Sequence, residues 1–333
     1  MNASLAHASV VQKERNTEQQ PTAAGRWLPS FAWAVLAYNI AVILWGTVVR
    51  ATGSGAGCGD HWPLCNGTVL PINPRVATVI EFTHRMMSGL TLVLVLALVV
   101  WVYRKTVRKH LARVAAVAAV LLTLNEALLG ALLVKLGLTA QSTSPWRPPM
   151  LALHLANTLL LLGALALTAH FLSPAGEAYR GRVAMRHLPL ALCGLAATLV
   201  VGVSGSLAAL GDTLFPATSL RSALLADFSS STAWLIRLRV VHPASVVVAA
   251  AFILWLLWQA VFRQEQSGNR SLAHVLIGLL ALQVALGVFD VLLRAPLWMQ
   301  VLHLLGADVF WSVLVVLTAR ICLRVVESGE QTD

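Results

Sequence analysis

Residues 79–103 read VIEFTHRMMSGLTLVLVLALVVWVY, and from Met86 onward this stretch carries no charged residue. A helix needs about 20 mostly apolar residues to cross a bilayer, and this segment is long enough to do so. The whole chain of 333 residues has the same character, with 58% hydrophobic and only 11% charged residues. Soluble domains contain about 25% charged residues, so the composition argues against a soluble enzyme and excludes a disordered chain.

The fold class predicted from this pattern is an all-α integral membrane protein with eight transmembrane helices. Residues 1–28 are mostly polar and lack the apolar core of a signal peptide, so we predict a disordered cytoplasmic tail there. A second cytoplasmic tail is predicted over 323–333. The eight apolar stretches are 29–50, 76–103, 111–134, 149–172, 188–211, 235–262, 272–293 and 297–322.

The basic residues predict how these helices are oriented in the membrane. Lys and Arg are concentrated in the N-terminal tail and in the segments after every second span, including the run from Arg104 to Arg113. Cytoplasmic loops of membrane proteins carry such an excess. We therefore expect both termini in the cytoplasm, the loop 51–75 on the outer face, and a location in the cell (inner) membrane.

An internal repeat divides the chain into two halves. Met150-Leu-Ala-Leu-His154-Leu in the fourth span matches Met299-Gln-Val-Leu-His303-Leu in the eighth. Four is an even number of spans, so both halves enter the membrane from the same side. We expect two pseudo-symmetric four-helix bundles, 29–172 and 188–322, related by an axis along the membrane normal.

Four of the ten histidines lie inside predicted spans at a similar depth: His84, His154, His242 and His303. Counted from the outer end of each even-numbered span, all four lie roughly 8–12 Å deep. Ionisable side chains at that depth are usually functional. One such histidine could simply hydrogen-bond a neighbouring helix, but four favour axial ligation of haem, one pair in each half. Zinc is the competing ligand, although it prefers a tighter cluster with a carboxylate or thiolate.

Acidic and basic residues make the two histidine pairs chemically unequal. Glu81 lies one helical turn before His84, where it either pairs with Arg85 or lies beside a haem-sized pocket. In the second half Arg239 holds the matching position, and Arg237 lies near it; both would suit haem propionates. Three further acids within spans, Glu126, Asp290 and Asp308, have no role that the sequence assigns.

Cys58 and Cys65 lie in the predicted outer loop, where oxidising conditions permit a disulfide. Their spacing fits neither a CxxC zinc site nor a haem attachment motif. The pair is either a staple for the loop or a redox-sensitive element that affects function.

Together these motifs resemble the haem A synthase family, in its cysteine-containing bacterial form. The resemblance runs from about residue 30 to residue 322. The matching stretches are Gly46-Thr-Val-Val-Arg50-Ala-Thr-Gly53-Ser-Gly55, Cys58 to Cys65, Glu81-Phe-Thr-His84-Arg85, His154-Leu-Ala-Asn157, His242-Pro243 and His303.

The resemblance implies an enzyme that oxidises the C8 methyl group of haem O to the formyl group of haem A, which terminal oxidases use. It implies that His242 and His303 hold a haem b cofactor, while His84 and His154 receive the substrate haem. Glu81 matches the family's glutamate beside the substrate. Some members carry a second cysteine pair in the loop that corresponds to 212–234, and this chain has none there.

The expected partners follow from the same resemblance. They are haem O, membrane lipid, an electron donor of the quinol class, and a haem O synthase or an oxidase assembly protein; a homo-oligomer is compatible with the sequence, and no nucleic acid is expected. The candidate haem propionate contacts are Arg50, Arg85, Arg237 and Arg239.

Three other protein classes were weighed against this interpretation. A di-haem cytochrome that only carries electrons would need the same four histidines, but it would not need Glu81 or the outer-loop motif. A haem O synthase, which is a prenyltransferase, would need aspartate-rich motifs for magnesium diphosphate, and the aspartates here are scattered. A transporter agrees with the composition but not with four histidines at one depth.

Overall fold

Eight helices of the protein are long and apolar enough to cross a membrane, as predicted, among residues 23–177, 179–183, 185–263 and 267–325, which the computed structural model describes. The sixth span combines α9 (Trp234–Arg237), the 3₁₀ turn η2 (Leu238–Val240), α10 (Val241–Leu257) and the π-helical turn η3 (Trp258–Phe262). The other seven spans are α2 (Ala23–Ala51), α3 (Val76–Lys105), α4 (Leu111–Lys135), α5 (Arg147–Leu172), α7 (Leu188–Leu214), α11 (Ser267–Leu292) and α12 (Leu297–Cys322).

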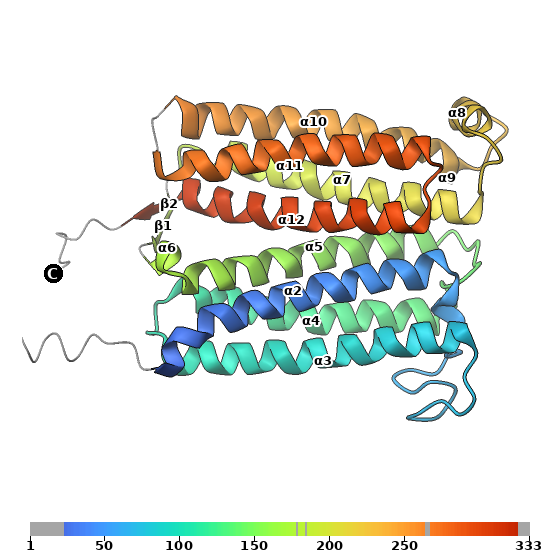
Figure 1. Cartoon of the computed structure of the whole chain (residues 1–333), viewed down its shortest axis with the longest axis horizontal. Helices are drawn as coiled ribbons and strands as arrows, with labels where there is room; N and C mark the ends of the chain where they lie inside the picture. The colour runs from blue at the N-terminus through green and yellow to red at the C-terminus, as the bar shows by residue number, and fades with distance from the viewer. Residues whose placement is uncertain (1–22, 178, 184, 264–266, 326–333) are drawn as a thin grey trace, which may run out of the picture.

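The helices lie side by side in one elongated bundle (Figure 1). The first four spans form one half, and α7, α10, α11 and α12 form the other. The chain alternates in direction, so α2 begins and α12 ends at the same end of the bundle. We call the opposite end, where α3 and α12 begin, the loop end, because residues 51–75 lie there. The pseudo-twofold relation between the halves and the orientation in the membrane stay predictions.

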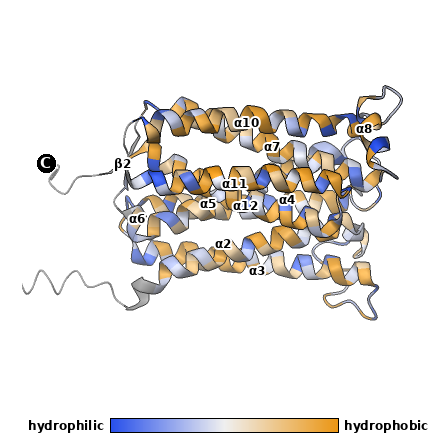
Figure 2. Cartoon of the chain, turned by 45° about the horizontal axis from the view of Figure 1, so that its top comes forward, coloured by the Kyte–Doolittle hydropathy of each residue, from blue (hydrophilic) through white to orange (hydrophobic). Residues whose placement is uncertain are grey.

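At the interface between the halves, α5 packs against both α12 and α7, and α2 packs against α12. In the most apolar window of each span, 50% of α5 and 44% of α12 residues are buried, against 6% for α11. Trp311 of α12 donates a hydrogen bond from its indole nitrogen to the Leu159 carbonyl of α5 (2.6 Å). Arg50 of α2 crosses to the other half as well, where it contacts α7 and α12. Apolar residues cover the length of the helices (Figure 2), as expected for a bundle embedded in lipid.

Proline marks the beginning of several spans. Pro148 lies in the first turn of α5, and Pro296 immediately precedes α12. Proline is tolerated there because the first N–H groups of a helix have no partner within it. The first span begins at Ala23, before the predicted boundary at residue 29, so residues 23–28 are helical rather than part of a tail.

Short elements at the bundle ends were not predicted. Strand β1 (Tyr179–Val183) pairs antiparallel with β2 (Leu323–Val325), which occupies the start of the predicted C-terminal tail. The predicted loop 212–234 contains α8 (Leu220–Phe228), whose N-terminus is capped by Ser219. Two further turns, α6 (Pro174–Glu177) and η1 (Ser54–Ala56), lie in connections. Residues 1–22 and 326–333 of the predicted tails lie outside the described residues.

Candidate functional site

The four predicted ligand histidines lie at one level of the bundle. Each is within about eight residues of the start of its span at the loop end, roughly 12 Å along the helix axis. Each imidazole also lies against a glycine of the preceding span. A residue with a side chain at those positions would meet the ring, so the helices approach the histidines closely.

His242 and His303 form the better-defined pair. Their ring centroids are 6.5 Å apart and the ring planes are perpendicular. Two imidazoles on opposite sides of one metal, each bonded over about 2 Å, have ring centres roughly 6 Å apart. Nδ1 of His242 lies 3.1 Å from the Val201 carbonyl oxygen. A carbonyl only accepts, so Nδ1 donates this hydrogen bond, and Nε2 keeps the lone pair that a metal needs.

His84 and His154 are the second predicted pair, on α3 and α5. Nδ1 of His154 lies 3.4 Å from Oε1 of Glu126, on α4. Glu126 also accepts hydrogen bonds from the Asn157 amide and the Thr158 hydroxyl (both 2.5 Å). Nδ1 of His84 has no hydrogen-bond partner among the described residues. The acid beside a histidine in this half is therefore Glu126, to which the sequence had given no role.

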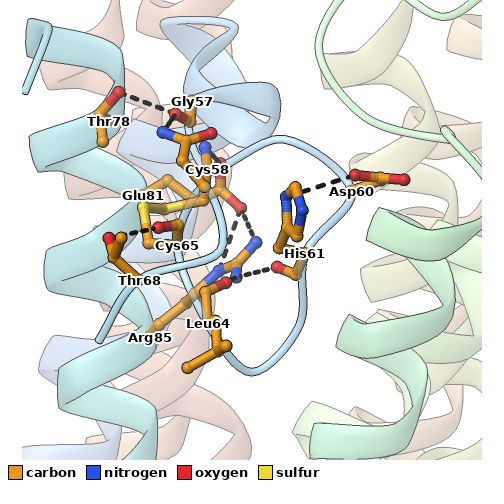
Figure 3. Close-up of a disulfide and its surroundings, with 11 residues drawn as sticks. Gly57, Cys58, Asp60, His61, Leu64, Cys65, Thr68, Thr78, Glu81 and Arg85 are labelled. Atoms are coloured by element: carbon orange, nitrogen blue, oxygen red, sulfur yellow. Dashed lines mark hydrogen bonds and ion pairs between the residues drawn. A yellow bond between two sulfur atoms is a disulfide. The ribbon is translucent and has the colours of Figure 1, made fainter. Parts of the chain in front are cut away.

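Glu81 is buried beneath the loop 51–75 (Figure 3). Its Oε2 accepts a hydrogen bond from the Cys58 backbone N–H (2.8 Å), and its Oε1 accepts from Arg85 (2.5 Å). The ion pair predicted as one alternative is thus present. The side chains of Glu81 and Arg85 are only 4% and 9% exposed. The Glu81–Arg85 ion pair is therefore buried, and removing one partner would leave an uncompensated buried charge.

Arg85 and the disulfide complete the attachment of this loop to α3. Arg85 donates hydrogen bonds to the carbonyl oxygens of His61 and Leu64 (both 2.5 Å). Cys58 and Cys65 are joined by a disulfide, as predicted, and both are buried. The loop is thus closed on itself by the disulfide and held to the helix by Glu81 and Arg85 (Figure 3).

Three of the arginines proposed as propionate contacts are engaged by protein groups. Arg50 donates to the Ala209 carbonyl, the Thr213 hydroxyl and the Gln300 amide oxygen, and Arg85 is held by Glu81 and the loop. Arg239 binds the carboxylates of Asp212 and Asp227 (both 2.6 Å). Arg237 is exposed.

Two acids of the C-terminal half remain without an assigned role. Neither carboxylate oxygen of the fully buried Asp308 has a hydrogen-bond partner among the described residues. The same holds for Oδ1 of Asp290.

The side chains fit a flat prosthetic group held between imidazoles better than a bare metal ion. Within the described part of the chain, no three His, Cys, Asp or Glu side chains gather closely enough to hold an ion. The 6.5 Å spacing of the His242 and His303 rings agrees with two imidazoles on either side of one flat group.

The fold and these histidines define a class, that of integral membrane proteins with eight candidate spans and four histidines at one level of the bundle. The chain belongs to the COX15-CtaA family, described as cytochrome oxidase assembly protein, whose model matches residues 29–315.

Individual relatives carry two different names. A "Heme A synthase" from Bacillus cereus is 28% identical over 302 residues, covering 86% of this chain and 92% of the relative. One from Alkalihalophilus pseudofirmus is 40% identical over 126 residues, covering 38% of this chain and 40% of the relative. A "Protoheme IX farnesyltransferase" from Thermus thermophilus is 44% identical over 297 residues, covering 89% of this chain but 48% of the relative. The chain thus spans about half the length of the Thermus relative.

Proposed function

We propose that this protein is a haem A synthase, an oxidoreductase that converts the C8 methyl group of haem O to the formyl group of haem A for terminal oxidases. The observation that carries the proposal is the unequal surroundings of the two histidine pairs. His154 lies beside the carboxylate of Glu126, whereas His242 is bonded to the neutral Val201 carbonyl. Two identical electron-carrying haem sites would not need this difference.

In this proposal the C-terminal half holds haem b as the resident cofactor. His242 and His303 are its ligands, supported by the 6.5 Å ring spacing and by the hydrogen bond that fixes His242. A haem with two histidine ligands supplies one-electron transfer when bound. Arg237 and Arg239 shortly precede His242 in the sequence; Arg239 is held by carboxylates, so we assign the propionate contact to the exposed Arg237.

The N-terminal half takes haem O as its substrate, with His84 and His154 as ligands. The carboxylate of Glu126, 3.4 Å from Nδ1 of His154, would increase the basicity of this imidazole, as carboxylates near metal-bound histidines do. Glu81, one turn from His84, supplies negative charge that stabilises positive charge at the methyl carbon, or accepts a proton from it. Burial beneath the loop 51–75 keeps bulk water from this carboxylate.

The name of the Thermus relative supports the proposal that a haem O synthase is a partner in this reaction. A farnesyltransferase acting on protohaem produces a haem with a prenyl tail, the chemical class of the substrate proposed here. The family match covers most of this chain, and the relative is about twice the length of the matched part. We propose that a haem O synthase supplies the substrate in the cell (inner) membrane, that both termini are cytoplasmic, and that a quinol-type donor supplies electrons.

The proposal is tested by expressing the protein with a haem O synthase in a host that makes haem O but no haem A. Haems extracted from the membranes are then separated by chromatography. The expected result is the appearance of haem A, dependent on this chain. If the purified protein carries only haem b and no haem A appears, the alternative of a di-haem electron carrier replaces this one.

A further inference from the structure

A glycine faces each of the four histidines from the span that precedes it. A Cβ atom at Gly205 would lie 2.9 Å from Cε1 of His242, and one at Gly46 would lie 3.2 Å from Cε1 of His84. The corresponding distances are 3.4 Å for Gly287 with His303 and 4.0 Å for Gly130 with His154. The first two are closer than an ordinary contact, so no larger residue fits unless the ring moves.

Other span glycines do not face an imidazole. A Cβ at Gly89 or Gly278 would meet nothing within 4 Å, and one at Gly202 would press on Leu159. Among the described glycines within spans, close approach to an imidazole is thus found at the four predicted ligand histidines; in the loop 51–75, Gly59 and Gly67 also lie near the ring of His61. Close helix packing alone does not require a histidine opposite a glycine, because Gly202 allows equally close packing against Leu159.

We infer that these glycines are positioning residues that set the orientation of the haem-ligating imidazoles; the inference rests on the proposed function. Gly205 gives the clearest case. It lies one turn after Val201 on α7, and the Nδ1–H of His242 donates to the Val201 carbonyl at 3.1 Å. A glycine leaves the helix backbone uncovered, so the ring can come close enough to reach this carbonyl. That hydrogen bond directs Nε2 toward the iron.

A different chemical group lies near Nδ1 of His154. Glu126 lies one turn before Gly130 on α4, and its carboxylate is 3.4 Å from Nδ1 of His154, a charge contact without a hydrogen bond. In both halves, then, one helix supplies a glycine against the ring and, one turn earlier, a polar group near Nδ1. That group is a hydrogen-bonded neutral carbonyl for His242 and a nearby carboxylate for His154.

The test replaces Gly205 with Ala and compares it with Gly202→Ala, one turn away on the same helix. Both substitutions crowd α7, but only the first crowds an imidazole. The measurements on the purified, haem-loaded protein are the ratio of haem b to protein, the reduced absorption spectrum, the low-spin electron paramagnetic resonance signal and the midpoint potential. We expect Gly205→Ala to lose haem b, or to keep it with a changed signal and potential. Gly202→Ala should lower thermal stability and leave the signal as in wild type.

A second pair of variants, with less steric crowding, keeps the test valid if Gly205→Ala does not fold. Gly287→Ala brings a methyl group 3.4 Å from Cε1 of His303 and should shift the spectrum less than Gly205→Ala; Gly278→Ala on the same helix should shift nothing. A wild-type signal and potential in both Gly205→Ala and Gly287→Ala would overturn the inference, as would an equal shift in Gly202→Ala. Absence of haem b from the wild-type protein would instead refute the proposed function, and this inference with it.

Discussion

The two halves of the protein use opposite charges for the same structural task. Three residues before His84, Glu81 holds the loop 51–75 through the Cys58 N–H. Three residues before His242, Arg239 holds the segment around α8 through Asp227 and the Ala223 carbonyl. A repeated scaffold therefore keeps an anchor at one position while its chemistry changes. The difference shows that an acid near a ligand histidine is not by itself proof of a catalytic role.

The halves also differ in how their loop ends are closed. The N-terminal loop carries a disulfide and is fastened by a buried ion pair, whereas the C-terminal segment contains α8 and has no cysteine. If the N-terminal half takes the substrate, as we propose, a fastened loop keeps the surroundings of the reacting group fixed, which electrostatic catalysis requires. The variants below test whether the two halves differ in the haem that they bind and in their role.

The largest effect is expected from the ligands of the resident haem. His242→Ala or His303→Ala should abolish stable haem b binding, because one imidazole cannot replace the two whose ring centroids lie 6.5 Å apart. Pyridine haemochrome analysis of the purified variants measures this. His61→Ala, in the loop 51–75 and half exposed, is the matched control and should keep normal haem content. Normal haem b in both ligand variants would remove the distinction between the halves.

Glu81→Gln should lower haem A formation by about 10²-fold or more, because it removes an acid–base or charge-stabilising group while keeping the shape. The variant should keep haem b and accumulate haem O or a hydroxymethyl intermediate, as seen by chromatography. Its buried pairing with Arg85 means that the loop also loses an anchor.

A control for this structural effect is Thr78→Val, which removes a second loop anchor, the hydrogen bond from Thr78 to the Gly57 carbonyl (2.7 Å). Among the described residues Thr78 makes no hydrogen bond to Glu81, so removing the Thr78 hydroxyl tests the anchoring of the loop alone. Near-normal haem A from Glu81→Gln, or an equal loss in Thr78→Val, would reduce Glu81 to an anchor like Arg239.

The double variant Cys58→Ser, Cys65→Ser should weaken retention of haem O several-fold and leave haem b nearly unchanged. The disulfide closes a loop that is attached to α3, in the N-terminal half. Haem O and haem b are quantified from the same preparation, so each serves as reference for the other. Equal loss of both haems would mean that the disulfide supports the whole bundle rather than one half.

The smallest effects are expected at the two basic residues before His242. Arg239→Gln leaves Asp212 and Asp227 without their cation and should cost about 1–3 kcal/mol of stability, read as a lower melting temperature. Arg237→Gln changes an exposed side chain, so its effect on stability should stay within about 0.5 kcal/mol. If Arg237→Gln weakens haem b binding, that residue contacts a propionate.

The sequence predicted the architecture well because the physical constraint on a membrane helix is strong. All eight spans were located, and the disulfide was confirmed. Their boundaries were less accurate: the first helix begins at Ala23, before the predicted residue 29. The β1–β2 pairing was missed, since it joins residues more than a hundred positions apart in short segments without a clear alternating pattern.

The surroundings of the histidines could be predicted only in part. The periodicity placed Glu81 on the same face as His84, but not beneath a loop, because the loop path depends on hydrogen bonds from Arg85 to backbone carbonyls. The partner of His242 is itself a backbone carbonyl, which no sequence pattern reveals. Glu126 offered a signal, an acid on the span next to His154, yet choosing it required the rotation of α4 relative to α5.

The central claim is that the two halves bind different haems, and it is tested most directly by chromatography of haems extracted from purified wild type, His154→Ala and His303→Ala. The protein should be isolated from cells that make haem O. Wild type should contain haem b together with haem O or haem A. His154→Ala should retain haem b alone, and His303→Ala should lose haem b. A single haem type in wild type, diminished equally by both substitutions, would contradict the account.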